Sequence, residues 1–240
     1  MLNLGTHINN GDKVLNVLRV MQICDSNFPI GSFNHSYGME TYLRDNKIKD
    51  RSTLKEWLTV FLKNVFIYND GLAIRIVYES LRKLDFDRIW QLDREITVSS
   101  VAVETRNGGK LVASRMIELF LQLYDIELLK DYGEKIKNKE VFGHPAIVFA
   151  IVMYSLDFSE REGSVYHMYS TIYTLIQNAV RGIPLGQKDG QLLLKEISES
   201  FNDLYDKTKK MDYELFGACS PGIELSQINH EVLDFRLFMS

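Results

Sequence analysis

Cysteine is scarce in this chain, and the motifs of the common enzyme classes are missing. Cys24 and Cys219 are the only cysteines among 240 residues, which excludes a disulfide framework and fits a reducing compartment. There is no G-x-S-x-G nucleophile motif, no phosphate-binding P-loop and no dinucleotide-binding glycine fingerprint. The stretch GIPLGQKDG, residues 182–190, has glycines and a lysine without the P-loop spacing. No active site is therefore visible from motifs alone.

Long apolar runs and an excess of positive charge are absent too. The longest apolar stretch, PAIVFAIVMYSL at 145–156, is well short of the roughly 20 residues that cross a bilayer. The first residues, MLNLGTHINNGDK, lack the charged and then apolar pattern of a signal peptide. The formal net charge of -4 argues against a nucleic-acid partner. We therefore expect a soluble, cytoplasmic protein with neither a membrane nor a nucleic-acid partner.

What the sequence does contain is helical periodicity along almost its whole length. Apolar residues recur in steps of three and four over 54–65 and again over 166–180. Only ITVSSVAV, residues 96–103, has the β-branched density of a strand, and without a partner strand it is expected to be helical. No repeat or Pro/Gly/Ser-rich linker divides the chain. The sequence predicts an all-α, single-domain bundle of roughly nine or ten helices.

Local signals place some helix ends. Thr53 with Glu56 reads as a capping box, and Ser164 reads as the start of the tyrosine-rich helix that follows. Stops are predicted at 69–71, at Gly133 and at Gly182. The charged stretches 132–140 and 157–164 are expected to be surface loops.

The segment SNFPIGSFNHSYGMETYL, residues 26–43, interrupts the helical pattern. Pro29 displaces the residue before it from the α region, Gly31 permits a turn, and Gly38 costs about 1 kcal/mol in a helix. After this turn the segment is expected to continue as a helix, on which Tyr37 and Glu40 share one face with Phe33. Two interpretations stay open: two packed faces, which the pattern favours, or a polar edge of Tyr37 and Glu40 for a partner.

A second irregular segment, AVRGIPLGQKDGQLLL at 179–194, reads as a tight corner between two helices. Gly182 suits a left-handed position, Pro184 forces Ile183 to be extended, and Gly186 permits a second turn. In the structural interpretation, the polar side chains of this corner interact favourably with the helix dipole or donate hydrogen bonds to loop carbonyls. They are Arg181, Gln187 and Gln191.

The end of the chain is unusually apolar. After Pro221-Gly222, the sequence IELSQINHEVLDFRLFMS keeps apolar residues to its last positions, where a free terminus is commonly polar. We expect this tail to be docked on something, and the dipeptide to uncouple it from the preceding helix. The predicted organisation is a mobile extension at 1–13, an all-α domain at 14–222 and a partner-docking tail at 223–240.

The nearest metal-binding signal lies in the same tail. His230-Glu231-x-x-Asp234 places His230 and Asp234 one helical turn apart, as in H-E-x-x-H zinc helices. An aspartate replaces the second histidine, and His144 is the only distant ligand that we consider. An all-α metal-dependent hydrolase built on these residues is the alternative function, against a surface or interface role for His230.

Several segments occur in an order that carries a family resemblance. They are ICDSNFPIGSFNHSYGMETYL, TRNGGKLVASRM, GHPAIVFAIV, AVRGIPLGQKDGQLLL and the terminal HEVLDFRLFMS. The chain resembles the UreF family of urease accessory proteins over nearly its whole length after the N-terminal extension. The family pattern P-x-G-x-F-x-x-S-x-G-x-E is carried by Pro29, Gly31, Phe33, Ser36, Gly38 and Glu40. The pattern A-V-R-x-x-P-L-G-Q-x-x-x-Q is carried by Ala179, Val180, Arg181, Pro184, Leu185, Gly186, Gln187 and Gln191. The ending H-E-x-x-x-x-R-L-F-x-S is carried by His230, Glu231, Arg236, Leu237, Phe238 and Ser240. Two positions depart from the pattern, Ser32 after Gly31 and the glycine pair of ETRNGGK.

The resemblance implies an all-α adaptor without catalysis of its own. It implies a homodimer that joins UreD, also called UreH, and the GTPase UreG on apo-urease, where GTP hydrolysis drives nickel insertion. No cofactor is expected to be tightly bound, because the assembled complex handles the nickel. The expected structural residues are Pro29, Gly31, Gly38, Pro184 and Gly186. The expected partner-binding residues are Tyr37, Glu40, Arg181, Gln187, Gln191, His230, Glu231, Arg236, Leu237 and Phe238.

Overall fold

Helix α8 (Pro145–Ser155) runs through the middle of the molecule because its sequence is apolar on every side. All side chains from Ala146 to Met153 are buried, as a helix that is hydrophobic all round requires. His144 caps its first turn by accepting the Ala146 N–H, and Pro145 occupies the first helical position, where no N–H is needed. Helix α4 (Asp70–Lys83) packs along α8 and buries most of its own residues.

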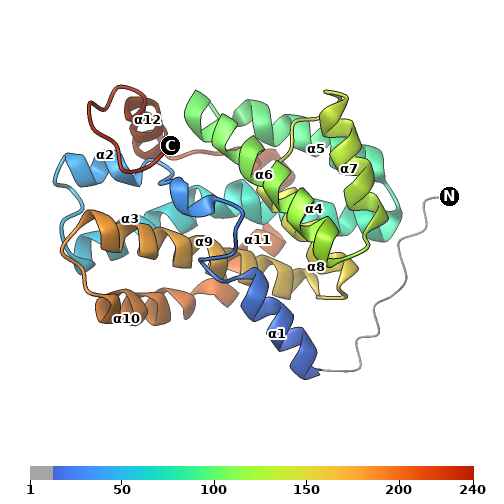
Figure 1. The fold of residues 1–240 in the computed structure, drawn as a ribbon, viewed down its shortest axis with the longest axis horizontal. Helices are drawn as coiled ribbons and strands as arrows, with labels where there is room; N and C mark the ends of the chain where they lie inside the picture. Colours follow the sequence, from blue (N-terminus) through green and yellow to red (C-terminus); the bar gives the residue numbers. More distant parts are fainter. Residues whose placement is uncertain (1–12) are drawn as a thin grey trace.

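The computed structural model describes residues 13–240, and Figure 1 shows how its helices are arranged. The other helices are α1 (Lys13–Ile23), α2 (Met39–Arg44), α3 (Arg51–Asn64), α5 (Phe86–Ser99), α6 (Val103–Leu123), α7 (Glu127–Lys137), α9 (Glu160–Gly182), α10 (Gln187–Ser198), α11 (Phe201–Lys210) and α12 (Pro221–His230). Three short 3₁₀ turns complete the described chain: η1 (Ser32–Asn34), η2 (Phe66–Tyr68) and η3 (Tyr213–Leu215).

Two apolar clusters form the interior. One joins α4, α5, α6, α7 and α8, and the other joins α3, α10 and α11 with the second half of α9. The ring of Tyr169, on α9, packs against both clusters. The continuous contact between them makes one domain, with α2, α12 and the C-terminus gathered at one end in Figure 1.

The prediction of an all-α single domain is confirmed. No strand occurs between residues 13 and 240, where twelve α-helices are found, one of them (α2) only six residues long. None of the helices in this part of the chain has the length and apolar character needed to cross a membrane. The extension predicted at 1–13 lies outside the described residues, except for Lys13, which begins α1.

Several predicted helix ends are wrong by a few residues. Helix α3 is capped by Asp50, whose carboxylate accepts the Thr53 N–H while Thr53 bonds back, so Thr53 is the third helical residue. Helix α9 begins four residues before Ser164, with Ser159 as the cap and Glu162 as its reciprocal partner. In both cases an earlier oxygen-bearing side chain supplies the same capping chemistry.

Two predicted stops and two predicted loops are also wrong. The triplet 69–71 begins α4, and Gly133 lies inside α7, where its small size admits Ile117. The stretch 132–140 is mostly helix, with Tyr132 buried and hydrogen-bonded to Asp93. The stretch 157–164 begins α9. Its Glu160 is buried and pairs with two cations, whereas an unpaired buried carboxylate would be costly.

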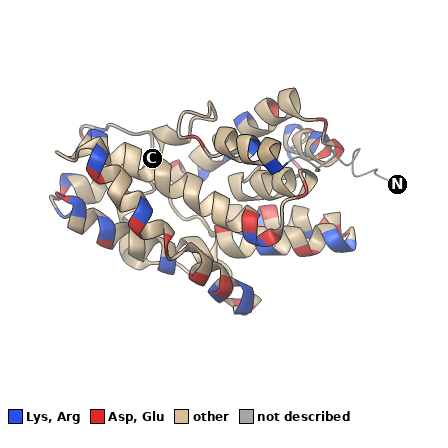
Figure 2. Ribbon diagram, turned by 90° about the horizontal axis from the view of Figure 1, so that it is seen from below, with Lys and Arg blue, Asp and Glu red and all other residues tan. Residues whose placement is uncertain are grey.

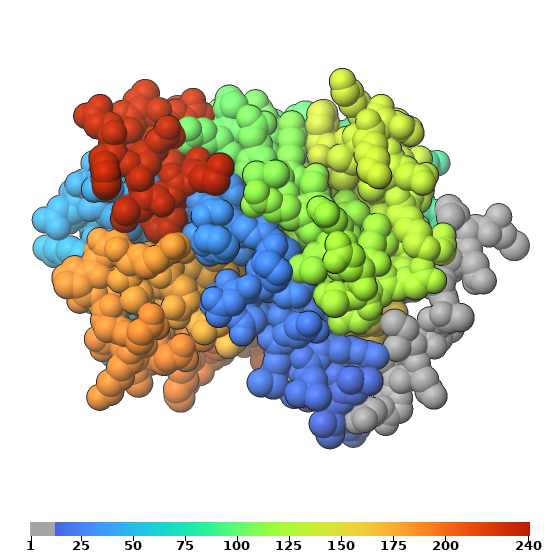
Figure 3. Space-filling view, in the orientation of Figure 1, coloured from blue at the N-terminus to red at the C-terminus, as the bar shows by residue number. Residues whose placement is uncertain are grey.

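The strand-like stretch 96–103 is divided between two helices. Helix α5 ends at Ser99, Ser100 and Ala102 are extended, and α6 begins at Val103. Pro221 does not uncouple the tail but occupies the first position of α12, for which its fixed φ is suited. Beyond α12, residues 231–240 fold back over α2 and the start of α6, as the red surface in Figure 3 shows.

Candidate binding site around Glu40

Glu40, in the first turn of α2, is a buried carboxylate that holds the end of the chain. Its oxygens accept the backbone N–H groups of Leu237 at 2.6 Å and Phe238 at 3.1 Å, and they contact His230 Nε2 at 2.9 Å. Arg44, one turn along α2, lies 3.3 Å from the same carboxylate. Glu40 has no exposed surface, so these donors together compensate for its removal from water.

His230, the last residue of α12, is buried between two carboxylates. Its Nδ1 lies 2.7 Å from Glu104 Oε2, opposite the contact of Nε2 with Glu40. Glu104, in the first turn of α6, also binds Arg236 at 2.5 Å. Burial acts to raise the pKa of Glu104, but the hydrogen bonds from His230 and Arg236 outweigh it and hold that pKa below its usual value. We call Glu40, Glu104, His230 and Arg236 the Glu40 network, and residues 231–240 the tail segment.

Two features of the structure require glycine at position 38, namely its backbone conformation and its packing. Its φ of +86° is left-handed, and a Cβ there would come within 2.9 Å of Gln227 Cγ and still closer to Ser226 on α12. Thr41 strengthens the same contact by donating to the Ser226 carbonyl at 2.7 Å. Gly38 therefore lets α12 approach the start of α2 closely, which only glycine permits without strain.

Gly31 is left-handed as well, with φ +82°, and a Cβ there would collide with Arg115. Pro29 sits just before this turn and is exposed. The expectation of one continuous helix through 33–42 is wrong, since residues 35–38 are not helical and α2 begins at Met39. Left-handed Gly38 and Tyr37 break the helix before Glu40.

Tyr37 and Glu40 therefore do not share a helical face. Tyr37 has φ +53° and turns its ring towards Phe61, with ring centroids 6.1 Å apart. It lines a partly open pocket of about 120 Å³ together with Asp70 and His144. Burial, followed by the nearby Asp70, raises the pKa of the Tyr37 hydroxyl. A partner role for Tyr37 stays a prediction, with its ring turned into the molecule.

The last residues bind the segment around η1. The carbonyl of Ser240 accepts the Ser36 N–H at 2.5 Å, and its hydroxyl lies 2.7 Å from His35 Nδ1. The Met239 N–H donates to the Asn34 carbonyl at 2.7 Å. Gly108 makes room for the His35 ring, because a Cβ there would lie 2.6 Å from His35 Cε1. Gly108, the first glycine of the sequence ETRNGGK, thus has a packing role, whereas a Cβ at Gly109 would meet only ordinary contact.

The corner at 179–194 joins the same region through Arg181. Its guanidinium donates to the Phe33 carbonyl at 2.8 Å and stacks near Phe238, 5.2 Å from that ring centre. Ile183 is extended before Pro184, as predicted, whereas Gly182 is an ordinary last residue of α9 that lies against Leu43. Gly186 is extended and precedes α10. The side chains of Gln187 and Gln191 are exposed on α10.

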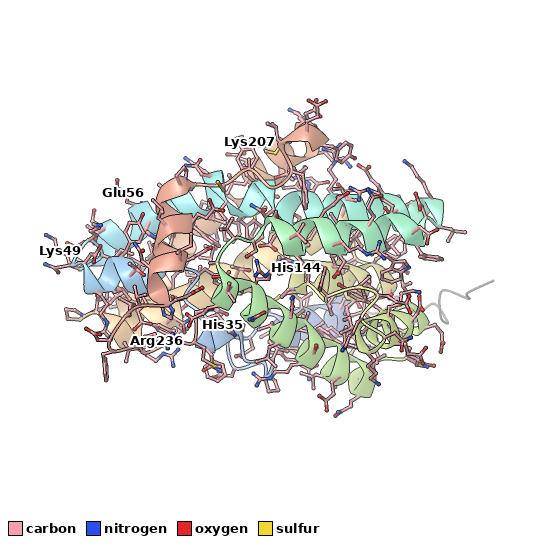
Figure 4. The ribbon with its side chains drawn as sticks, turned by 90° about the horizontal axis from the view of Figure 1, so that it is seen from above. His35, Lys49, Glu56, His144, Lys207 and Arg236 are labelled. Carbon is pink, nitrogen blue, oxygen red and sulfur yellow. The ribbon has the colours of Figure 1, made fainter. Side chains whose placement is uncertain are left out.

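The structure brings most of the motif residues into one place. Glu40, Arg181, His230, Glu231, Arg236, Leu237 and Phe238 all contact η1, α2, the first turn of α6 or one another, although they come from opposite ends of the sequence. Figure 4 shows His35 and Arg236 near each other in this region. Gln187 and Gln191 lie outside it, on α10.

The tail segment has two unlike sides. Phe238 is buried, and the backbone N–H groups of Leu237 and Phe238 face Glu40. Four other apolar side chains of the segment are exposed: Val232 by 78%, Phe235 by 68%, Met239 by 57% and Leu237 by 51%, while Leu233 is half-buried. A run of such exposure beside a fixed backbone is typical of a surface that contacts another molecule.

The alternative metal site is not assembled. Both ring nitrogens of His230 are occupied by Glu40 and Glu104, and Glu231 accepts the Val103 N–H at 3.1 Å. His144 faces Asp70 and His167 instead. Over residues 13–240 no three His, Cys, Asp or Glu side chains are grouped as metal ligands. The arrangement therefore favours a structural role for His230, whose side chain is buried, and its partner-binding role stays a prediction.

Sequence reasoning missed the acceptor Glu104 and the partly buried group around Asp70. The Asp70 carboxyl lies 3.9 Å from His144 Nδ1 and 4.0 Å from His167 Nε2. Burial raises the pKa of Asp70 to about 7. Burial lowers the pKa of His144 to about 3, with the neighbouring His167 contributing, and that of His167 to about 4. Nothing in the spacing of these residues signals their meeting, which depends on how α4, α8 and α9 pack.

The described residues 13–240 form an all-α domain whose most distinctive side chains fix the two-sided tail segment. The family model for UreF matches residues 48–198, and the chain belongs to the UreF family of urease accessory proteins.

Similarity to individual members extends over nearly the whole chain. It is 43% identical to the urease accessory protein UreF of Streptococcus salivarius over 223 residues, which is 93% of this chain and 94% of that protein. It is 41% identical to the UreF of Lachnoclostridium phytofermentans over 224 residues, 93% of this chain and 98% of that protein. It is 40% identical to the UreF of a Bacillus species over 224 residues, 93% and 99% of the two chains.

Proposed function

We propose that this protein is an adaptor in urease maturation that joins UreD (UreH) and the GTPase UreG on apo-urease, so that GTP hydrolysis drives nickel insertion. The observation that carries the proposal is the two-sided tail segment, fixed on one side by Glu40 and apolar on the other. Because the backbone of such a surface is already fixed, binding a partner loses little further conformational entropy. In this role the chain works in the cytoplasm, holds no tightly bound cofactor and leaves the nickel to the assembled complex.

The charge distribution supports a protein partner. Figure 2 shows acidic and basic residues interspersed along the helices of that view, and the net charge is -4. A nucleic-acid partner would require a continuous basic face. We assign UreD to the exposed side chains of the tail segment.

UreG, or a contact needed to assemble it, is assigned to the corner of Arg181, Gln187 and Gln191. Gln187 and Gln191 are exposed in the first turns of α10, so they can bind without first being released from the fold. Substitution of Arg181 would be harder to interpret, because its guanidinium also donates to the Phe33 carbonyl within the fold.

The experiment is a co-expression pull-down with UreD and UreG. Leu237→Ser removes a half-exposed side chain and leaves the backbone N–H that binds Glu40 in place. It should reduce UreD capture at least tenfold, in the range of an interface hot spot of about 1.4 kcal/mol or more. Leu123→Ser, an exposed leucine at the far end of α6, is the matched control and should bind normally. Equal capture by both variants would remove the tail from the interface.

The chain expressed and purified alone tests the absence of catalysis. The purified chain should hydrolyse neither urea nor GTP, and it should contain no stoichiometric metal by elemental analysis. GTP turnover in a sample free of UreG would contradict the adaptor role. Metal bound at one equivalent, and lost in His230→Gln, would favour the hydrolase instead.

A further inference from the structure

We propose that the partner covering the tail segment presents acidic side chains to the turn η1, where Arg115 and Arg181 lie beside the exposed ring of Phe33. The inference rests on the proposed function, because it takes the tail segment as the covered surface, and it adds the chemistry of the partner. In Figure 3 the blue surface around this turn borders both the red tail segment and the green surface of α6.

Arg115, on α6, lies directly against the turn. Its guanidinium occupies the space next to Gly31, so that a Cβ on this glycine would collide with Nη1. Its positive charge also helps to lower the pKa of the His35 ring, after the larger effect of burial. The Arg115 side chain is nevertheless exposed. The missing side chain at Gly31 therefore lets an accessible positive charge lie beside the turn.

Arg181, at the end of α9, binds the same turn from another helix. Its guanidinium carbon lies 5.9 Å from the centre of the Phe33 ring, and the group donates to the Phe33 carbonyl at 2.8 Å. Neither the ring nor the carbonyl carries a net charge, so these contacts fix the guanidinium without neutralising it. The tail segment reaches the turn as well, through the Met239 N–H that donates to the Asn34 carbonyl.

Neither guanidinium is paired with a carboxylate. Most arginines in the part of the chain that the structure describes do form such a pair. Within residues 13–240 no acidic side chain pairs with Arg115 or Arg181, and Glu104 in the first turn of α6 is already bound to Arg236. The turn thus carries two accessible positive charges in a protein whose net charge is -4.

The apolar side chains at the turn favour a protein partner over a phosphate group. Phe33 is 42% exposed and Met239 is 57% exposed. Aromatic residues, methionine and arginine are enriched in protein interfaces. A phosphate would require several donors that converge on one point, whereas Arg181 is directed to the Phe33 carbonyl. The surface that fits is apolar, with carboxylates placed to meet the arginines as water is displaced.

The test measures the affinity of the full-length chain for UreD by surface plasmon resonance at two salt concentrations. Binding should weaken between about 0.05 and 0.5 M sodium chloride, because salt screens exposed charges. Arg115→Gln should weaken binding about two- to fivefold at the lower salt concentration and reduce the salt dependence. Arg115→Glu should weaken binding by about tenfold or more, because it places like charges opposite one another.

Arg94→Glu is the matched control, since it makes the same charge change on α5, where Arg94 donates to the Glu140 carbonyl. It should bind UreD as the unmodified chain does. Circular dichroism should show unchanged helical content for both Arg115 variants, because Arg115 forms no hydrogen bond or ion pair within residues 13–240. If Arg115→Glu binds as well as Arg94→Glu, the proposal is wrong.

Leu237→Ser distinguishes this failure from a failure of the proposed function. Loss of UreD binding in Leu237→Ser, with normal binding in Arg115→Glu, would leave the tail segment as the interface and remove its acidic complement. Normal binding in both variants would remove the tail segment as well. Stronger inhibition by sodium phosphate than by sodium chloride of equal ionic strength would assign the arginines to a phosphate ligand and overturn the proposal.

Discussion

At the scale of single residues, the close approach of α12 to Gly38 gives a sharp prediction. Gly38→Ala must place a Cβ against Ser226 and Gln227 at a backbone φ of +86°. The strain should lower the free energy of unfolding by about 1 to 3 kcal/mol. Chemical denaturation followed by circular dichroism measures this.

Gly109→Ala is the matched control for that change. It lies inside α6, and its Cβ would meet nothing nearer than Pro145 Cδ at 3.9 Å. The control should be neutral or stabilise by up to about 1 kcal/mol, because alanine is the better helix former. If Gly38→Ala proves as harmless as Gly109→Ala, the close contact between α2 and α12 is not formed in solution.

The sequence could indicate which residues are unusual but not what they touch. Gly38 and Glu40 stand out in the sequence, yet their partners Ser226, Leu237 and Phe238 lie almost 200 positions away. Local propensities carry no information about such pairings, which arise only when the helices pack. Glu104 shows no signal at all, because a glutamate in the first turn of a helix is ordinary.

At the scale of elements, helix existence was predictable and helix ends were less so. The periodic apolar pattern produces the long helices, whose buried faces match it. The ends depend on which of several neighbouring oxygen-bearing side chains does the capping, and Asp50 and Ser159 were preferred over the later Thr53 and Ser164. The stretch 132–140 was predicted to be a loop because most of its residues are charged or polar, and the sequence pattern does not show that Tyr132 is buried.

Helix α1 gives the prediction that belongs to this scale. It projects from the body in Figure 1, and of its residues only Ile23 is buried. Val17, Leu18 and Met21 are between 56% and 64% exposed. An apolar stripe of this kind suits the self-complementary interface of a two-fold dimer, which is the oligomer expected from the family resemblance.

Leu18→Asp tests that assignment. A charge in an apolar dimer contact should weaken self-association by about 10- to 100-fold, measured by sedimentation equilibrium. Leu215→Asp, on the η3 turn where that side chain is 45% exposed, should leave association unchanged. The assignment fails if the chain is monomeric before any substitution, or if both variants associate as the unmodified chain does.

At the scale of the whole molecule, the partly buried group of Asp70, His144 and His167 should shape the dependence of stability on pH. The pKa of Asp70 is raised to about 7, so between pH 4 and 6.5 the folded chain holds a proton there that the unfolded chain has lost. The histidine pKa values are lowered to about 3 and about 4, so over the same range the unfolded chain holds two protons that the folded chain lacks. The unfolded state thus binds about one proton more from this group, and its contribution to stability should rise with pH by about 1.4 kcal/mol per unit.

Asp70→Asn isolates the carboxyl from the histidines. It removes the one group whose contribution falls as the pH rises, so the two histidines act unopposed. The difference in unfolding free energy between the variant and the unmodified chain should therefore move in favour of the variant as the pH increases from 4 to 6.5, by about 1.4 kcal/mol per unit. Urea unfolding at half-unit pH steps gives this difference directly. Asp203→Asn, on the exposed side of α11, is the control and should show no such trend. A difference for Asp70→Asn that stays constant with pH would mean that Asp70 is ionised in the folded chain, which would require a cation or ordered water in the cavity beside it.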